Sequence, residues 1–124
     1  MKVKELMKEA YIIDKDISLN DAASIMSSKD VSSLILYIKD DIKGIVTEKD
    51  LLQNFGKKAK ISEIMTKKVL SVDSESEVSA ALAMMKEFKK KKLPVVEKGK
   101  LVGIINLIDI AINSDEIGDD FFFN

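Results

Sequence analysis

The sequence contains no cysteine and no histidine, and all 20 of its basic residues are lysine. Without cysteine the chain has no disulfide framework, no thiolate nucleophile and no cysteine-based metal site. Without histidine the commonest general base and metal ligand is missing, so catalysis would depend on Asp, Glu, Lys, Ser or Tyr. Without arginine, a phosphate would have to be bound by Lys ammonium groups or backbone N–H groups.

Long apolar runs and a strong net charge are also absent. No apolar run approaches the ~20 residues that a membrane-spanning helix needs, and the N-terminal MKVKELMKEA lacks the apolar stretch of a signal peptide. The formal net charge of −1 gives no overall field that would attract nucleic acid. We expect a cytoplasmic protein without a membrane partner. Its 124 residues, of which 46% are hydrophobic, are enough for one compact domain with a genuine core.

What the chain does contain is an internal repeat. Residues 44–50 read GIVTEKD, and residues 103–109, 59 positions later, read GIINLID. Nearer the start, residues 3–7 (VKELM) match residues 61–65 (ISEIM) at an offset of 58, so the second copy carries one inserted residue. Because two copies are too few for a solenoid, they suggest two half-domains. The predicted division is repeat 1 at 1–59, repeat 2 at 60–113, and an acidic, aromatic tail at 114–124.

Each copy predicts the same order of elements: a short strand, a helix, a two-stranded hairpin and a second helix. Ser18 with Asp21 forms a capping box for the first helix, which continues with apolar residues at helical spacing. Lys98-Gly99 predicts the hairpin turn of the second copy. Pro94 indicates that its strand is an edge strand or begins there, since proline cannot donate to a central ladder. The predicted fold class is α/β (α+β), with two β-α-β-β-α units packed about a pseudo-two-fold axis.

The doubled heptad has two interpretations. Thr47 with Asp50 is itself a capping box at a strand-to-helix junction, and Asn106 with Asp109 fits the same template, so both heptads could serve only to start helices. Their glycines would then only permit close packing. Alternatively, a carboxylate in the first turn suits a ligand with hydroxyl donors, such as a ribose diol, whose phosphates extend sideways toward lysine. The residues by themselves leave both interpretations open.

The repeat resembles a tandem pair of cystathionine-β-synthase (CBS) domains, the Bateman module. Units of that family run β-α-β-β-α and carry Gly-hydrophobic-x-Ser/Thr-x-x-Asp at the strand-to-helix junction. GIVTEKD fits this motif, GIINLID departs from it only at Asn106, and LPVVEKGKLVGII looks like the family's central hairpin. The resemblance covers nearly the whole chain. It implies a regulatory sensor that is not an enzyme and has no cofactor, and whose ligand is AMP, ADP, ATP or S-adenosylmethionine.

The resemblance also implies two ligand clefts, each placing the heptad of one repeat against strands of the other. The first cleft would use Thr47, Asp50, Leu70, Ser71, Lys91, Lys92, Leu93 and Pro94. The second would use Asn106, Asp109, Tyr11, Ile12, Ser33 and Leu34. In each, the Asp would accept hydrogen bonds from ribose hydroxyls. Because the first cleft has the Thr and the lysines, we expect it to bind phosphorylated nucleotides, and the second to be empty, weak or suited to a less negative ligand.

Two other functions stay open at this point. The chain could be a ligand-independent structural or interaction module, or it could bind nucleic acid through the lysine run 89–92, which could equally complement a helix dipole in solvent. The expected partners are a separate regulated protein and a second copy of the chain. The homodimer would use apolar positions on the second helix of each repeat, namely Leu51, Leu52, Ile108, Ile110 and Ile112. The Phe121–123 run of the tail is expected to dock onto a partner subunit.

Overall fold

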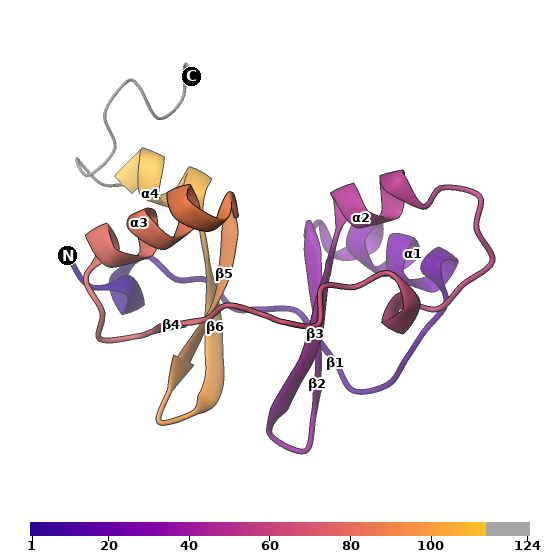
Figure 1. The fold of residues 1–124 in the computed structure, drawn as a ribbon, viewed down its shortest axis with the longest axis horizontal. Coiled ribbons are helices and arrows are strands. Elements are labelled where there is room, and N and C mark those ends of the chain that lie inside the picture. The colour runs from indigo at the N-terminus through magenta and orange to yellow at the C-terminus, as the bar shows by residue number, and fades with distance from the viewer. Residues whose placement is uncertain (114–124) are drawn as a thin grey trace. The chain divides into compact units, whose positions relative to one another are not determined.

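The computed structural model describes residues 1–113, so the predicted tail and its Phe run lie outside the described residues. The fold is mixed α+β, with two three-stranded sheets, each accompanied by two α-helices (Figure 1). The chain forms two compact units. One consists of residues 10–69, and the other combines residues 1–9 with residues 70–113.

The unit of residues 10–69 has the sheet order β1-β2-β3. Strand β1 (Ile12–Ile13) pairs in parallel with β2 (Ser33–Ile38), which pairs in antiparallel with β3 (Asp41–Thr47). Its helices are α1 (Leu19–Lys29) and α2 (Glu48–Gln53). The predicted start of α1 is confirmed, because Ser18 Oγ accepts the Asp21 N–H at 3.0 Å. The buried core comprises Leu19, Ala22, Met26, Leu34, Val46 and Ile61.

The second unit repeats this arrangement with the sheet order β4-β5-β6. Its elements are β4 (Val72–Asp73), α3 (Val78–Phe88), β5 (Lys92–Glu97), β6 (Lys100–Asn106) and α4 (Leu107–Asn113). The predicted hairpin turn is confirmed: Lys98 and Gly99, between β5 and β6, have φ of 51° and 78°. Two successive left-handed residues match the twist of a two-residue hairpin.

The prediction of an edge strand at Pro94 is wrong, because β5 is the central strand of its sheet. Parallel pairing with β4 begins only at Val95, one residue further on. In the other unit, Ile35 holds the position equivalent to Pro94, and its N–H donates to the Tyr11 carbonyl at 3.0 Å. Pro94 has no N–H, so the carbonyl of Leu70, the counterpart of Tyr11, receives no hydrogen bond from residue 94.

Each unit is completed by a short segment from the start of the other sequence repeat. The 3₁₀ turn η1 (Val3–Glu5) belongs to the unit of β4-β5-β6, where Figure 1 shows it in indigo near α3. The turn η2 (Ile61–Glu63) belongs to the unit of β1-β2-β3. Val3 is fully buried, and Ile61 is only 1% exposed. The two segments that match at an offset of 58 therefore each contribute a buried aliphatic side chain to the core of a unit.

These segments explain the glycines of the doubled heptad. A Cβ added at Gly44 would overlap Met65 Sδ and lie 2.8 Å from Met65 Cγ, whereas one at Gly103 would lie 2.7 Å from the carbonyl oxygen of Lys8. Neither glycine has a positive φ. Residues 1–9 and 60–69, the segments that complete the two units, are called the inserted segments below. Glycine is thus required at both positions because an inserted segment approaches closely, and not because the backbone conformation is unusual.

Candidate functional site at the two strand-to-helix junctions

The first heptad forms the predicted capping box. Thr47 ends β3 in an extended conformation, and its Oγ1 accepts the Asp50 N–H at 3.3 Å. In return, Asp50 Oδ2 accepts the Thr47 N–H at 2.9 Å and the Thr47 hydroxyl at 3.1 Å. The cap uses only the Oδ2 atom of Asp50. Because a carboxylate has about four acceptor positions over its two oxygens, the capping role does not exhaust this side chain.

Several residues assigned to the second cleft lie in the same unit as this first heptad. Ser33 stands directly opposite Thr47 in the β2–β3 ladder and is buried. Tyr11 is joined to β2 through the hydrogen bond from Ile35 to its carbonyl, and Ile12 follows it in β1. Leu34 belongs to the core, with its side chain fully buried, so it offers a ligand only backbone atoms.

The second heptad is built differently. Asn106 ends β6, and its Nδ2 donates to Asp109 Oδ2 at 3.2 Å. The other oxygen of Asp109 forms an ion pair with Lys8 Nζ at 2.9 Å. The side chain of Asp109 is only 8% exposed, whereas that of Lys8 is 63% exposed. Both oxygens of Asp109 are therefore engaged, and Asn106 Oδ1 is buried without a hydrogen bond among the described residues.

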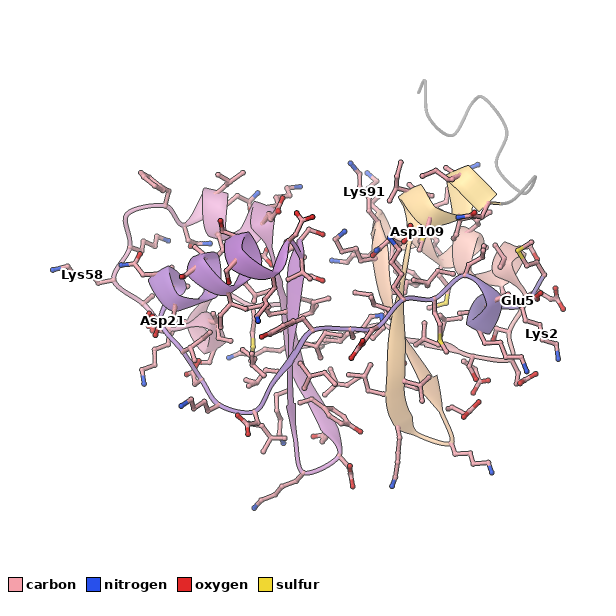
Figure 2. All side chains as sticks on the ribbon, turned by 180° about the vertical axis from the view of Figure 1, so that it is seen from behind. Lys2, Glu5, Asp21, Lys58, Lys91 and Asp109 are labelled. Atoms are coloured by element: carbon pink, nitrogen blue, oxygen red, sulfur yellow. The ribbon has the colours of Figure 1, made fainter. Side chains whose placement is uncertain are left out.

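The lysine run links the end of α3 to the second heptad. Lys89 caps the C-terminus of α3 in the left-handed conformation, and Lys89, Lys90 and Lys91 are exposed, as expected for cations that complement a helix C-terminus in solvent. The Lys91 carbonyl accepts the N–H of Leu107 at 2.8 Å, and Lys92 stands opposite Asn106 in the β5–β6 ladder. Figure 2 labels Lys91 and Asp109 in this one unit.

The remaining strand residues of the first predicted cleft belong to this unit too: Leu70, Ser71, Leu93 and Pro94. The side chains of Leu93 and Pro94 are buried, which leaves their backbone as the contact available to a ligand. Their pairing with Thr47 and Asp50, which lie in the other unit, stays a prediction.

Sequence reasoning missed Lys8 as a functional candidate. The signal was present, because the offset of 58 that matches residues 3–7 with 61–65 also matches Lys8 with Thr66. The structure makes the two positions equivalent: Lys8 forms a β-bridge with Ile104, and Thr66 forms the same bridge with Ile45. One copy thus places a cation where the other places a neutral hydroxyl.

Two further pairs fix the inserted segments to their units. Glu75 accepts hydrogen bonds from the Lys2 and Lys4 ammonium groups, each at 2.6 Å, and these bonds lower its pKa to about 2. In the other unit, Asp16 accepts from the Ser62 hydroxyl at 2.5 Å and the Ser62 N–H at 3.1 Å. Burial raises the pKa of Asp16, but the hydrogen bonds from Ser62 outweigh it and lower the pKa. The same attachment is therefore an ion pair in one copy and a neutral-donor hydrogen bond in the other.

A hollow of about 450 Å³ lies at the start of α1, with Lys57, Lys58 and Lys60 among its lining residues. None of the predicted site residues lines it. Within residues 1–113, no helix is long and apolar enough to cross a membrane. The same residues contain no group of three acidic side chains placed to hold a metal ion.

Comparison with known proteins identifies the family. The CBS domain model matches residues 3–57 and again residues 61–115, so the chain belongs to the CBS domain family and carries two copies of the domain. The chain is 31% identical over 121 residues to the inosine-5′-monophosphate dehydrogenase of Nitrosopumilus maritimus, which covers 93% of this chain and 25% of that protein. It is 26% identical over 117 residues to the CBS domain-containing protein YhcV of Bacillus subtilis, with 90% and 84% covered.

Among solved structures, the CBS domain pair of protein MJ0100 in complex with 5′-methylthioadenosine and S-adenosyl-L-methionine superposes with a TM-score of 0.83. That likeness has 26% sequence identity and covers 90% of this chain and 94% of that one. The chain spans only about a quarter of the length of the inosine-5′-monophosphate dehydrogenases that it matches. These proteins and this chain share the CBS domain pair, which is the family that the sequence motifs predicted.

Proposed function

We propose that this chain is a regulatory, non-catalytic CBS-pair module that binds adenosyl ligands at its two heptads and transmits their presence to a partner protein. The observation that carries the proposal is the acceptor geometry of the first heptad. Asp50 forms its helix cap through one carboxylate oxygen and keeps the acceptor capacity of the other. A ribose diol supplies two hydroxyl donors of the kind that such an oxygen binds. The complex of the MJ0100 pair with two adenosyl compounds supports this choice of ligand class.

In this proposal each type of residue has one role. Asp50 accepts from the ribose hydroxyls, and Thr47 steadies the ribose or the phosphate. Backbone groups near Ser71 in one copy and Ile12 in the other read the base, and the Leu70 carbonyl, which lacks a donor at Pro94, adds an acceptor there. AMP, ADP and ATP are the preferred ligands of the Thr47/Asp50 heptad, with Lys91 and Lys92 as the cations for the phosphates.

We also propose that the chain acts as a homodimer, but through fewer residues than the sequence suggested. Ile110 is fully buried in the core of its own unit, so the expectation that it faces a partner is wrong. Leu51 is partly exposed beside the core of the other unit, and its contact with a partner stays a prediction. Leu52, Ile108 and Ile112 are 75%, 57% and 72% exposed, and Phe55 adds a further side chain at 88%. Exposed side chains of this size on the second helices are apolar surface that a second copy would cover.

The test of the ligand proposal is calorimetric titration of AMP and S-adenosylmethionine into the wild type and three variants. Asp50→Ala removes charge-assisted hydrogen bonds of about 1.5–3 kcal/mol each, so its AMP affinity should fall by at least about tenfold. Asp109→Ala should leave the tighter site nearly intact, and Thr47→Ala should lie between the two. Glu48→Ala is the matched control, because it removes an exposed carboxylate from the same helix turn without touching the cap.

The outcomes separate the function from helix capping. If the heptads are only caps, Asp50→Ala costs about 0.5–2 kcal/mol of stability and the wild type shows no saturable binding. A folded Asp50→Ala protein with wild-type AMP affinity would return the first heptad to the interpretation of a helix cap alone. If Asp109→Ala instead loses most of the affinity, the sensor stands but its main site is the Asn106 heptad.

A further inference from the structure

The ion pair between Lys8 and Asp109 has no counterpart at the equivalent position of the other repeat. Lys8 reaches the second heptad because its own backbone is fixed there: its N–H donates to the Ile104 carbonyl at 2.8 Å and its carbonyl accepts the Ile104 N–H at 2.9 Å. Asn106 lies only two positions after Ile104, the partner of Lys8 in this bridge. The ammonium group is therefore delivered to Asp109 by a rigid main-chain bridge.

The two ends of this ion pair differ in burial. Asp109 is nearly buried, so a carboxylate there needs a donor or a cation. Lys8 is mostly exposed and has a flexible four-carbon stem, so its ammonium group can move to another anion without unfolding the bridge. A ligand can therefore displace the ammonium group from Asp109. The free-energy cost of this displacement depends on whether the ligand offers the ammonium group another anion.

Resting on the proposed function, we propose that Lys8 is the residue that selects ligands by charge at the Asp109 heptad. An uncharged adenosine must displace the ammonium group from Asp109 to bind through its ribose, and it offers Lys8 nothing in exchange. A phosphorylated adenosine supplies a new anion for the same ammonium group. The Asp109 heptad therefore accepts phosphorylated ligands and discriminates against neutral ones, whereas Thr66 imposes no such condition at Asp50.

This proposal differs from the expectation from the sequence that the second heptad is empty, weak or suited to a less negative ligand. That expectation did not include Lys8. The Asn106 side chain supports this proposal, because its Nδ2 donates to Asp109 Oδ2 and so leaves the buried side chain with a hydrogen-bond donor when Lys8 moves away.

The experiment compares AMP with adenosine by calorimetric titration in an Asp50→Ala background, where the remaining binding is that of the Asp109 heptad. Adding Lys8→Thr, the residue of the other copy, should raise adenosine affinity and lower AMP affinity, each by up to about fivefold, which corresponds to about 1 kcal/mol. The ratio of AMP to adenosine affinity should then fall by up to about 25-fold, the product of the two changes. The reciprocal Thr66→Lys in an Asp109→Ala background should raise the same ratio at the Asp50 heptad.

Lys4→Thr is the matched control, because Lys4 lies in the same segment and is similarly exposed but pairs with Glu75. Lys8→Thr keeps the main-chain bridge and should remain folded, which thermal unfolding checks. An unchanged AMP-to-adenosine ratio in the Lys8→Thr protein overturns the role of Lys8 while its AMP binding still upholds the proposed function. If Asp50→Ala binds neither compound and Lys8→Thr restores adenosine binding, the role of Lys8 is upheld in a stronger form. Absence of binding in the wild type and every variant overturns both proposals.

Discussion

Replacing each heptad glycine by alanine tests whether the inserted segments dictate these positions. At Gly44 the obstacle to a Cβ is the end of the Met65 side chain, which has several rotatable bonds and can move aside. At Gly103 the obstacle is the Lys8 carbonyl at 2.7 Å, which is held by a hydrogen bond on each side of the bridge to Ile104. The two substitutions are chemically identical but meet a soft obstacle in one copy and a rigid one in the other.

The expected magnitudes follow from this difference. Overpacking costs about 1–3 kcal/mol, and replacing a strand glycine returns about 0.5–1 kcal/mol of backbone entropy, so Gly44→Ala should cost about 0–2 kcal/mol. Gly103→Ala must also weaken two main-chain hydrogen bonds worth about 1 kcal/mol each, so it should cost about 2–4 kcal/mol. Urea unfolding measures both values, and hydrogen exchange at the Lys8 and Ile104 amides shows whether the bridge has opened.

Second-site variants sharpen the comparison. In a Met65→Ala background, Gly44→Ala should cost almost nothing, because its obstacle has been removed. In a Met7→Ala background, Gly103→Ala should remain as costly as before, since the nearest atom belongs to the Lys8 backbone. Equal costs for the two glycine substitutions, or full relief of Gly103→Ala by Met7→Ala, would refute the reasoning.

Two other predictions concern the attachment of residues 1–9 and the oligomeric state. Because the folded pKa of Glu75, about 2, lies below its usual 4.5, its contribution is complete above pH 4.5 and is lost as the pH falls toward 2. The protection factors of the amides of residues 1–9, which are corrected for the intrinsic exchange rate at each pH, should fall over that interval, and Glu75→Gln should remove this fall. Light scattering should give about twice the 13.8 kDa of one chain, and Leu52→Lys with Phe55→Lys should yield a monomer; a wild type of single-chain mass at micromolar concentration would contradict the proposed dimer.

The element order was predictable because the evidence for it is local. The capping box at Thr47 and the turn at Lys98-Gly99 each depend on residues within a few positions of one another. The order of strands within a sheet depends on long-range pairing, and that is where the sequence misled. Proline at position 94 argued for an edge strand, but the neighbouring strand β4 is only two residues long and begins its pairing at Val95. A central strand can therefore accommodate a proline just before its second partner begins.

The candidate site was predictable in its residue types but not in its charges. The aspartates at 50 and 109 followed from the repeated motif, whereas the cation on Asp109 comes from a residue about 100 positions away that enters through a separate segment. Burial was similarly hidden. Ile110 and Leu52 occupy second helices with similar hydropathy, yet one is fully buried and the other 75% exposed. Neither fact can be read from spacing, because both depend on which segment packs onto which helix.

The way the two copies have diverged gives the strongest reason to treat the heptads as more than caps. Positions that serve packing keep their character in both copies: a glycine under the inserted segment, a methionine in that segment, a buried aliphatic residue in each 3₁₀ turn. Positions whose polar atoms face the heptads and strand ends have changed in chemistry, as the pairs Thr47/Asn106, Thr66/Lys8 and Ile35/Pro94 show. A motif that only started helices would work with the same residues twice, since a threonine cap suits either helix. Divergence at these positions, within a preserved fold, is what two binding sites of different selectivity require.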